Sequence, residues 1–240
     1  MKLVAVTSGK GGTGSSCVAA YTAQALAKSG FSVLLVEWSS GFRALDLICG
    51  ASTRTVYDMG DVVAGRAAPE DAIVKSDLAL GMHLLPGALD SSLNSFSGLS
   101  LKGILNSMKW SYDFIVVDGI GFCRDDIRLF NSVILVTTPD CLSVRACAMK
   151  SAELLAAKAK GVRLIINRVP PKVMPMQGIR DFDDIIDQIG VQLIGVIPES
   201  PKLQVSSNNS QPLDEDSLTI KVFDNIAARL NGKTRPLLVR

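Results

Sequence analysis

The sequence is poor in histidine and contains no long run of one charge or of apolar residues. His83 is the only histidine and has no cysteine or carboxylate cluster near it in the chain, which argues against a histidine-based nucleophilic triad. The formal net charge is +2 without a basic run, so we expect no nucleic-acid partner. No apolar run is long enough to cross a bilayer, and the first residues pass directly into a strand pattern, so no signal peptide is expected.

Disulfide and metal signatures are also missing. The five cysteines include no CxxC pair, and an odd number without such pairs does not indicate a disulfide framework or a zinc site. We expect reduced thiols that pack as small hydrophobic residues, as in a cytoplasmic protein. The 240 residues show no linker and no internal repeat, so residues 1–240 are expected to form a single domain.

Apolar runs typical of buried strands alternate with helical patterns along the whole chain. Strands are expected at 3–6, 32–36, 82–85, 113–117, 133–137, 162–166 and 192–196. The main helices are expected at 17–29, 56–64, 99–108, 140–160, 182–189 and 217–230. The serine-rich segment 90–98 and the proline-rich segment 170–178 are expected to be loops. Continuous apolar strands separated by helices predict an α/β fold with a parallel sheet covered on both faces.

The most informative stretch is the turn between the first strand and the first helix. It carries four glycines: Gly9, Gly11, Gly12 and Gly14. Glycines let backbone N–H groups approach a phosphate closely, and the dipole of the following helix favours negative charge at its start. The turn therefore predicts an anion-binding site.

Two motifs fit this turn. Gly9, Gly11 and Gly14 match the dinucleotide pattern, and Glu37 stands where a ribose-binding acid would follow the next strand. Residues 9–16 also match a P-loop, except that Ser15 stands where a lysine should reach the β- and γ-phosphates. The turn by itself favours the first motif, which would indicate an NAD-binding oxidoreductase.

The rest of the chain favours the second motif. Several short segments, in this order and spacing, resemble the MinD/ParA family of P-loop ATPases, and its MinD branch more than its ParA branch. They are Lys10-Gly11-Gly12, Val56-Tyr57-Asp58, Leu84-Leu85-Pro86, the strand ending at Asp118, Thr137-Thr138-Pro139, Ser143-Val144-Arg145, Asn167-Arg168 and the segment 195–199. The resemblance covers nearly the whole chain.

The resemblance implies a three-layer, doubly wound, mostly parallel sheet of the P-loop NTPase type that binds ATP or ADP with Mg²⁺. Ser16 and Asp118 would hold the magnesium, and Lys10 would be the lysine that reaches a phosphate across a dimer interface. Asn167, Arg168 and Pro198 would line the adenine. The full set implied at the nucleotide is Lys10, Gly11, Gly12, Thr13, Gly14, Ser15, Ser16, Cys17, Asn167, Arg168 and Pro198.

By the same resemblance, we expect a homodimer with a protein partner in a cell-division or polarity system. Its expected location is the cytoplasm, peripheral to the inner membrane where a membrane helix is present. The MinD branch ends in an amphipathic membrane helix, whereas the chain here ends in a short tail that contains Pro236. Either that helix is absent or the sequence stops before it.

The chain departs from the family around the γ-phosphate. Ser15 replaces the P-loop lysine. In the first switch, the segment 37–41, Glu37 and Ser39 stand where the family has two aspartates. In the family, the second of these aspartates orients the attacking water. In the second switch, which follows Asp118, the glycine that meets the γ-phosphate is either shifted to Gly121 or replaced by Phe122.

These departures predict a degenerate enzyme. Loss of one positioned electrostatic group commonly costs about a hundredfold in rate, and here both a cation and an acid are missing. We therefore expect a pseudo-ATPase with no catalytic residue of its own, binding nucleotide weakly through the glycine amides or not at all. The alternative is an active ATPase in which Lys10 occupies the empty place within its own subunit.

Overall fold

The architecture is described from a computed structural model of the chain. The structure describes residues 1–90, 101–108, 111–119, 122, 124–171, 179–213 and 217–238. The strands are β1 (Lys2–Ser8), β2 (Val33–Glu37), β3 (Val74–Lys75), β4 (Met82–Leu85), β5 (Phe114–Asp118), β6 (Ser132–Thr137), β7 (Val162–Val169) and β8 (Gln192–Pro198). The helices are α1 (Ser15–Lys28), α2 (Leu45–Ile48), α3 (Met59–Val63), the 3₁₀ helix η1 (Pro69–Ala72), α4 (Leu101–Ser107), α5 (Arg124–Ile127), α6 (Cys141–Ala156), α7 (Phe182–Ile189), α8 (Pro201–Asn208) and α9 (Leu218–Leu230).

Within the described residues, the strands form one sheet in the order β3-β4-β2-β5-β1-β6-β7-β8. All neighbouring pairs are parallel except β3 with β4. The strand order reverses direction at β1, and such switch points are where α/β sheets bind ligands, beyond the carboxyl ends of the strands. This confirms the predicted doubly wound, mostly parallel sheet of the P-loop NTPase type.

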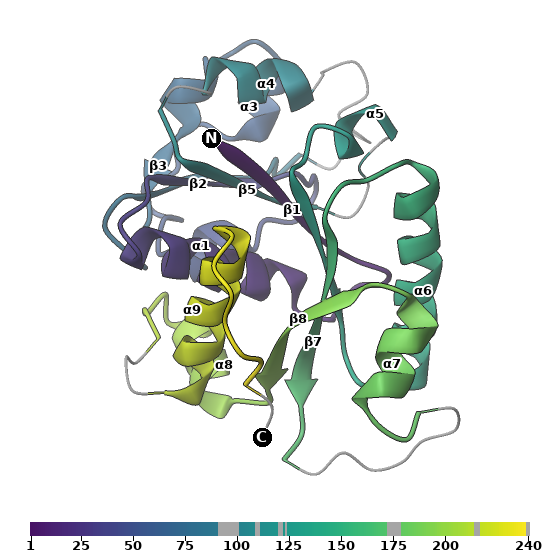
Figure 1. Ribbon diagram of the computed structural model, residues 1–240. Helices are drawn as coiled ribbons and strands as arrows, with labels where there is room; N and C mark the ends of the chain where they lie inside the picture. Colours follow the sequence, from purple (N-terminus) through teal and green to yellow (C-terminus); the bar gives the residue numbers. More distant parts are fainter. Residues whose placement is uncertain are drawn as a thin grey trace.

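Helices cover both faces of the sheet, because successive residues of a strand point to opposite sides. Leu3 and Ala5 of β1 belong to the core beneath α3, α4, α6 and α7, whereas Val4 and Val6 belong to the core beneath α1 and α9. Figure 1 shows α6 and α7 on one side of the sheet and α1, α8 and α9 on the other. The central strands β1, β2, β5 and β6 are buried on both faces, which explains why they read as continuous apolar runs.

Most expected elements are confirmed, with shifts that have local causes. The helix expected at 56–64 begins only at Met59, because Asp58 caps it in a capping box with Asp61. The helix expected at 140–160 ends at Ala156, and Lys158 then adopts a left-handed φ of 61° that ends a helix. The strand expected at 162–166 continues to Val169.

One helix, α8, was not expected at all. Its start carries recognisable signals, since the Ser200 side chain caps the helix and Pro201 occupies its first turn. Residues 91–98 and 172–178, the larger parts of the two expected loops, lie outside the described residues.

Candidate functional site

The turn between β1 and α1 places its glycines where the backbone requires them. Gly12 and Gly14 both have φ of +85°, a left-handed conformation that residues with a Cβ rarely adopt. Gly14 is the N-cap of α1, so it offers no side chain to the N–H groups of the first turn, and that turn contains no acid. A 14-residue helix that starts in this way favours an anion at its N-terminus.

Gly9 has a different role from the one that the dinucleotide pattern gives it. A Cβ at this position would lie 2.2 Å from the carbonyl carbon of Ala146 in α6. No side chain fits there, so this glycine allows the turn to pack against α6. The apparent dinucleotide pattern therefore includes a glycine that helix packing explains.

Asn167, at the end of β7, is attached to the turn. Its Nδ2 donates a 2.8 Å hydrogen bond to the carbonyl of Thr13, and a Cβ on Gly14 would lie 2.6 Å from the same nitrogen. The Asn167 side chain is buried, and its Oδ1 has no hydrogen-bond partner among the described residues. A buried acceptor without a partner is costly, so this oxygen is a ready contact for a donor on a bound ligand.

A cavity of about 520 Å³ adjoins this contact, and it brings several predicted residues together. Gly14, Cys17, Asn167, Arg168 and Pro198 all line it. The sequence did not point to its outer wall, which consists of Ser200, Pro201, Leu203, Gln204 and Ser207 from the start and length of α8. Burial raises the pKa of the Cys17 thiol to about 12, so Cys17 lines the cavity as a neutral group.

Asp118 and Ser16, the predicted magnesium residues, meet at the carboxyl end of β5. Burial raises the pKa of Asp118 to about 6, while a hydrogen bond from the Ser16 side chain acts in the opposite direction. Two oxygen donors at this place fit Mg²⁺, which takes few protein ligands and completes its shell with water and phosphate oxygens. The described residues contain no group of three or more His, Cys, Asp or Glu side chains that could hold a metal ion.

Glu37 is buried and engaged within the protein. Its Oε1 accepts hydrogen bonds from the backbone N–H groups of Ala44 at 2.8 Å and Leu45 at 3.3 Å. Its Oε2 accepts from the N–H of Gly87 at 3.1 Å. Burial raises its pKa to about 7, although these N–H groups oppose the shift. The carboxylate thus joins two loops, and it is not available as the ribose ligand that the dinucleotide interpretation requires.

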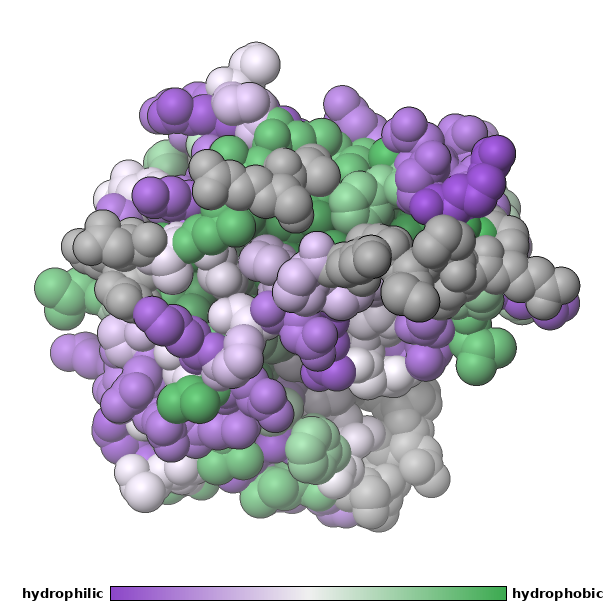
Figure 2. Space-filling model, turned by 90° about the horizontal axis from the view of Figure 1, so that it is seen from below, coloured by the Kyte–Doolittle hydropathy of each residue, from purple (hydrophilic) through white to green (hydrophobic). Residues whose placement is uncertain are grey.

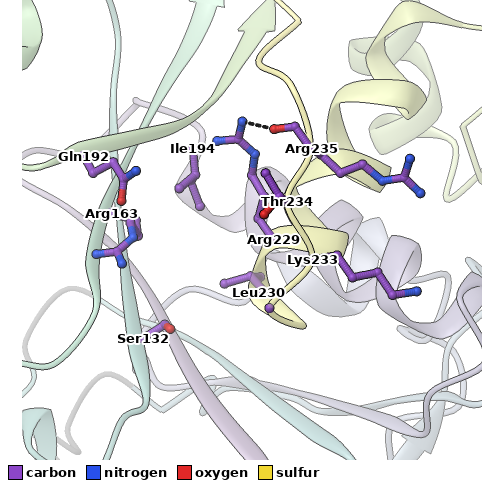
Figure 3. A pocket seen from close by; sticks show the side chains of 10 residues that line it. Ser132, Arg163, Gln192, Ile194, Arg229, Leu230, Lys233, Thr234 and Arg235 are labelled. Atoms are coloured by element: carbon purple, nitrogen blue, oxygen red, sulfur yellow. Dashed lines mark hydrogen bonds between the residues drawn. The ribbon is translucent and has the colours of Figure 1, made fainter.

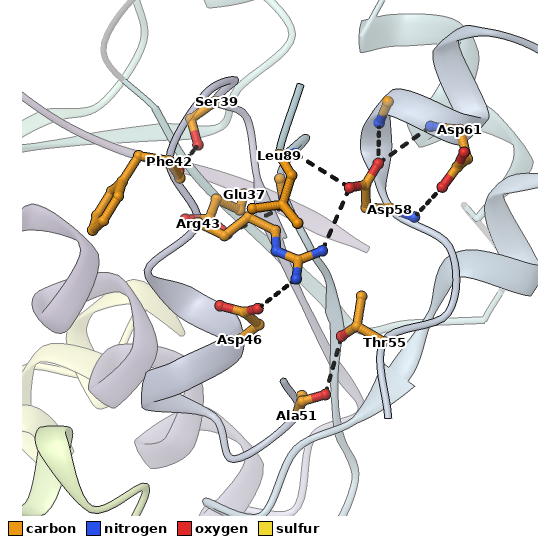
Figure 4. Close-up of polar contacts among 12 residues, drawn as sticks. Glu37, Ser39, Phe42, Arg43, Asp46, Ala51, Thr55, Asp58, Asp61 and Leu89 are labelled. Carbon is orange, nitrogen blue, oxygen red and sulfur yellow. Dashed lines mark hydrogen bonds and ion pairs between the residues drawn. The ribbon is translucent and has the colours of Figure 1, made fainter. Parts of the chain in front are cut away.

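The charged side chains that follow the first switch pair with one another inside the protein (Figure 4). The side chain of Arg43 is only 13% exposed and pairs with Asp46 at 3.0 Å and Asp58 at 3.4 Å. Asp58 also accepts a 3.2 Å hydrogen bond from the backbone N–H of Leu89. The two ion pairs anchor Arg43 to α2 and to the start of α3.

The positions expected to serve the γ-phosphate lack charge in the structure. The hydroxyl of Ser39 donates to the carbonyl of Phe42 at 3.3 Å. Phe122 is buried and packs edge-on against Phe130 at 5.1 Å, so its side chain belongs to the core. Gly121, the other residue considered for the second switch, lies outside the described residues.

Lys10 is exposed, and its ammonium donates a 3.2 Å hydrogen bond to the hydroxyl of Ser143 in α6. Ser143 and Asp140 also bond Thr138, so a small polar network surrounds this end of α6. The sequence pointed to Lys10 but not to Thr138 and Asp140 as its surroundings. In this structure the lysine contacts α6 of its own subunit.

All of these groups lie at the carboxyl end of the sheet, the end viewed in Figure 2, where hydrophilic and hydrophobic residues are interspersed on the surface. A glycine turn after the first strand, a buried strand-end aspartate and a cavity beside the helix define a P-loop nucleotide-binding domain. Residues 4–213 match the family model described as "CobQ/CobB/MinD/ParA nucleotide binding domain", and the chain belongs to this family.

Relatives within this family share nearly the full length of the chain. The septum site-determining protein MinD of Synechocystis sp. is 34% identical over 245 residues, covering 99% of this chain and 92% of the relative. MinD of Thermotoga maritima is 32% identical, covering 98% and 90%. These likenesses lie closest to the MinD branch, as the sequence segments predict.

Solved structures agree. The MinC:MinD cell division protein complex of Aquifex aeolicus matches with a TM-score of 0.83 and 30% identity, covering 100% of this chain and 99% of the other. MinD of Pyrococcus horikoshii complexed with Mg-ADP matches with a TM-score of 0.81 and 27% identity, covering 96% of both. None of these relatives supports the NAD-dependent interpretation.

Proposed function

We propose that this protein is a MinD-like protein of bacterial cell division that holds ATP or ADP with Mg²⁺ in the glycine turn. Three features support a nucleotide: the uncapped start of α1, the unpartnered Oδ1 of Asn167 and the cavity beside them. Ser16 and Asp118 would hold the magnesium, whose role when bound is to neutralise phosphate charge. The backbone N–H groups of the glycine turn would donate to the phosphates. Burial would exclude water from the carboxylate of Asp118, and Asn167 would orient the adenine base.

The finer proposal is that this chain hydrolyses ATP slowly or not at all. This proposal is supported by the uncharged residues Ser15 in the glycine turn and Ser39 in the first switch. Ser15 cannot extend an ammonium to the phosphates, and the hydroxyl of Ser39 bonds to a backbone carbonyl where a carboxylate would orient water. Binding and hydrolysis are thereby separated, because binding depends on backbone groups that are still in place.

The second candidate is an ordinary ATP-hydrolysing MinD protein. Its support is the similarity of at least 30% to MinD proteins across about nine-tenths of their length. In that case another cation, supplied by Lys10 or by the partner subunit, would compensate for Ser15.

A steady-state hydrolysis assay with Mg-ATP distinguishes the two, beside a calorimetric titration with Mg-ATP and with NAD. The degenerate protein shows turnover near background, and the double variant Ser15→Lys, Ser39→Asp raises it. Robust turnover of the natural sequence that Lys10→Ala abolishes would establish the active ATPase. Saturable NAD binding in place of ATP would refute the family-based assignment of the ligand.

We further propose a cytoplasmic homodimer with a protein partner of the division system. The exposed position of Lys10 is compatible with a reach into a second subunit. No helix in the described part of the chain has the length and apolar character needed to cross a membrane. Sedimentation velocity with and without a non-hydrolysable Mg-ATP analogue tests the dimer, and Lys10→Ala should weaken it only when nucleotide is present.

A further inference from the structure

A separate cavity of about 330 Å³ lies at the other end of the sheet from the glycine turn (Figure 3). It opens where β6, β7 and β8 begin, next to the end of α9 and the segment that follows α9. Its lining consists of Ser132, Arg163, Gln192, Ile194, Arg229, Leu230, Gly232, Lys233, Thr234 and Arg235. None of these lining residues is acidic, whereas Arg163, Arg229, Lys233 and Arg235 are cationic.

Two of the cations, Arg163 and Arg229, line this cavity and not the neighbouring one. Figure 3 shows Arg163 on the strand side and Arg229 opposite it, while Lys233 and Arg235 point away from Arg163. On that far side, Lys233 and Arg235 line a neighbouring cavity together with Asp224. Their charges are therefore shared between two cavities. The inference therefore depends on the two arginines across the first cavity.

Both arginines keep unused donors. The Nε of Arg229 is buried without a hydrogen-bond partner among the described residues, while another of its nitrogens donates to the carbonyl of Arg235. Arg163 donates from one nitrogen to the carbonyl of Val162 at 2.9 Å. Neither forms an ion pair in the part of the chain that the structure describes. A guanidinium with free N–H groups is suited to an oxyanion with several acceptor oxygens.

The carbonyl groups at the end of α9 do not offset the positive charge of the cavity. The carbonyls of a helix C-terminus carry partial negative charge, which would repel an anion. Here Lys2 donates to the carbonyl of Leu230 at 3.2 Å, and the N–H groups of Asn231, Gly232 and Lys233 bond to carbonyls of the last turn at 2.9–3.0 Å. These carbonyls are therefore satisfied within the protein.

We propose that this cavity binds a phosphate group, held between Arg163 and Arg229 with Gln192, Ser132 and Thr234 as further polar contacts. The site lies apart from the nucleotide and uses none of its residues. Its volume accommodates a phosphate ester as well as a free phosphate, so the group can belong to a soluble metabolite or to a lipid headgroup.

The test is an NMR titration of the ¹⁵N-labelled full chain with orthophosphate at constant ionic strength, with chloride as the reference anion. The amides of Gly232 and Thr234 report this site, and those of Gly11 and Gly14 report the glycine turn separately. We expect saturable shifts at Gly232 and Thr234, weakened about tenfold or more in Arg163→Gln. Lys102→Gln removes an exposed cation from α4 and should leave the affinity unchanged.

A second arm distinguishes the source of the phosphate. Vesicles of phosphatidylcholine containing phosphatidic acid are compared with phosphatidylcholine alone in a sedimentation assay. Binding to the first that Arg163→Gln abolishes supports a headgroup, whereas saturation by orthophosphate supports a soluble ligand. Absence of both, or binding unchanged in Arg163→Gln, would overturn the proposal. Arg229→Gln adds a second variant, with a thermal melt to show that loss of its bond to the tail has not unfolded the protein.

Discussion

The two sides of the nucleotide site differ in how they are built. The side formed by Gly12, Gly14 and Asn167 consists largely of backbone groups in left-handed turns, closed by one side-chain amide. The side formed by the switches depends on charged side chains, and there Glu37 is turned inward while Ser39 carries no charge. The backbone groups of the turn remain in place because glycine keeps the turn in shape, whereas Ser15 and Ser39 supply neither a cation nor an acid.

This difference also shows what an inward carboxylate does. Glu37 binds three backbone N–H groups of two loops, so it acts as an internal anchor for both. Glu37 is therefore a fixed structural contact of the first switch, and the comparison predicts different consequences for changes on the two sides.

The largest expected effect is on the backbone side. Gly14→Ala adds a Cβ 2.6 Å from the Asn167 amide at a left-handed φ, which should cost about 3 kcal/mol of unfolding free energy and abolish nucleotide binding. Gly30→Ala is the matched control, since it has a similar φ of +91° but open space around the added Cβ. Urea denaturation should show a loss of only about 1 kcal/mol for the control. Equal losses would show that strain, and not close approach, governs this turn.

The next effect concerns pH and the Glu37 anchor. Its pKa is raised from 4.5 to about 7 in the folded protein, so the folded state binds more protons than the unfolded state between these values. Stability should therefore fall as pH rises from 4.5 to 7, by about 3 kcal/mol or less, and level off above 7. Asp118, raised to about 6, contributes with the same sign below pH 6.

The fall in stability between pH 6 and 7 is due to Glu37, and Glu37→Gln should remove it. At low pH, where Glu37 is neutral, the variant should be less stable, because its NH₂ group cannot accept the Gly87 hydrogen bond. Thermal melts across this pH range provide the measurement. A slope that persists in Glu37→Gln would assign the titration to another group.

A smaller effect is expected from the amide that closes the backbone side. Asn167→Ala leaves the Thr13 carbonyl without its 2.8 Å partner and removes Oδ1 from the cavity. We expect a loss of about 1–2 kcal/mol in stability and about tenfold in nucleotide affinity, measured by denaturation and by calorimetric titration. Asn225→Ala removes an exposed amide that bonds only the tail in the described chain, and its nucleotide affinity should be unchanged. An unaltered affinity in Asn167→Ala would separate the cavity from the nucleotide.

The smallest effect is expected at Lys10. Its hydrogen bond to Ser143 is made by an exposed ammonium, so Lys10→Ala should change the unfolding free energy by less than about 0.5 kcal/mol. Denaturation without nucleotide measures this. A loss above about 2 kcal/mol would mean that the polar network at α6 depends on the lysine for stability.

Much of the fold could be predicted because most strands are apolar runs and most helices repeat apolar residues at helical spacing. Met82–Leu85 and Phe182–Ile189 fall at their expected bounds for this reason. Helix α8 was missed since it buries only Leu203 and has little apolar periodicity, although Ser200 and Pro201 signal its start. The glycine turn, Asp118 and Asn167 could be identified from sequence, but the wall of the cavity next to them could not, because α8 provides it.

The sequence alone determined the glycine turn, the order of strands and helices and the missing cation at position 15, since these depend on residue type and spacing along the chain. Only the tertiary structure decided the roles of Gly9 and Glu37, because both depend on segments distant in sequence: α6 in the first case and the loops at Ala44 and Gly87 in the second. The same holds for the two arginines of the second cavity, one on β7 and the other on α9, which become neighbours only when the sheet and the last helix pack together.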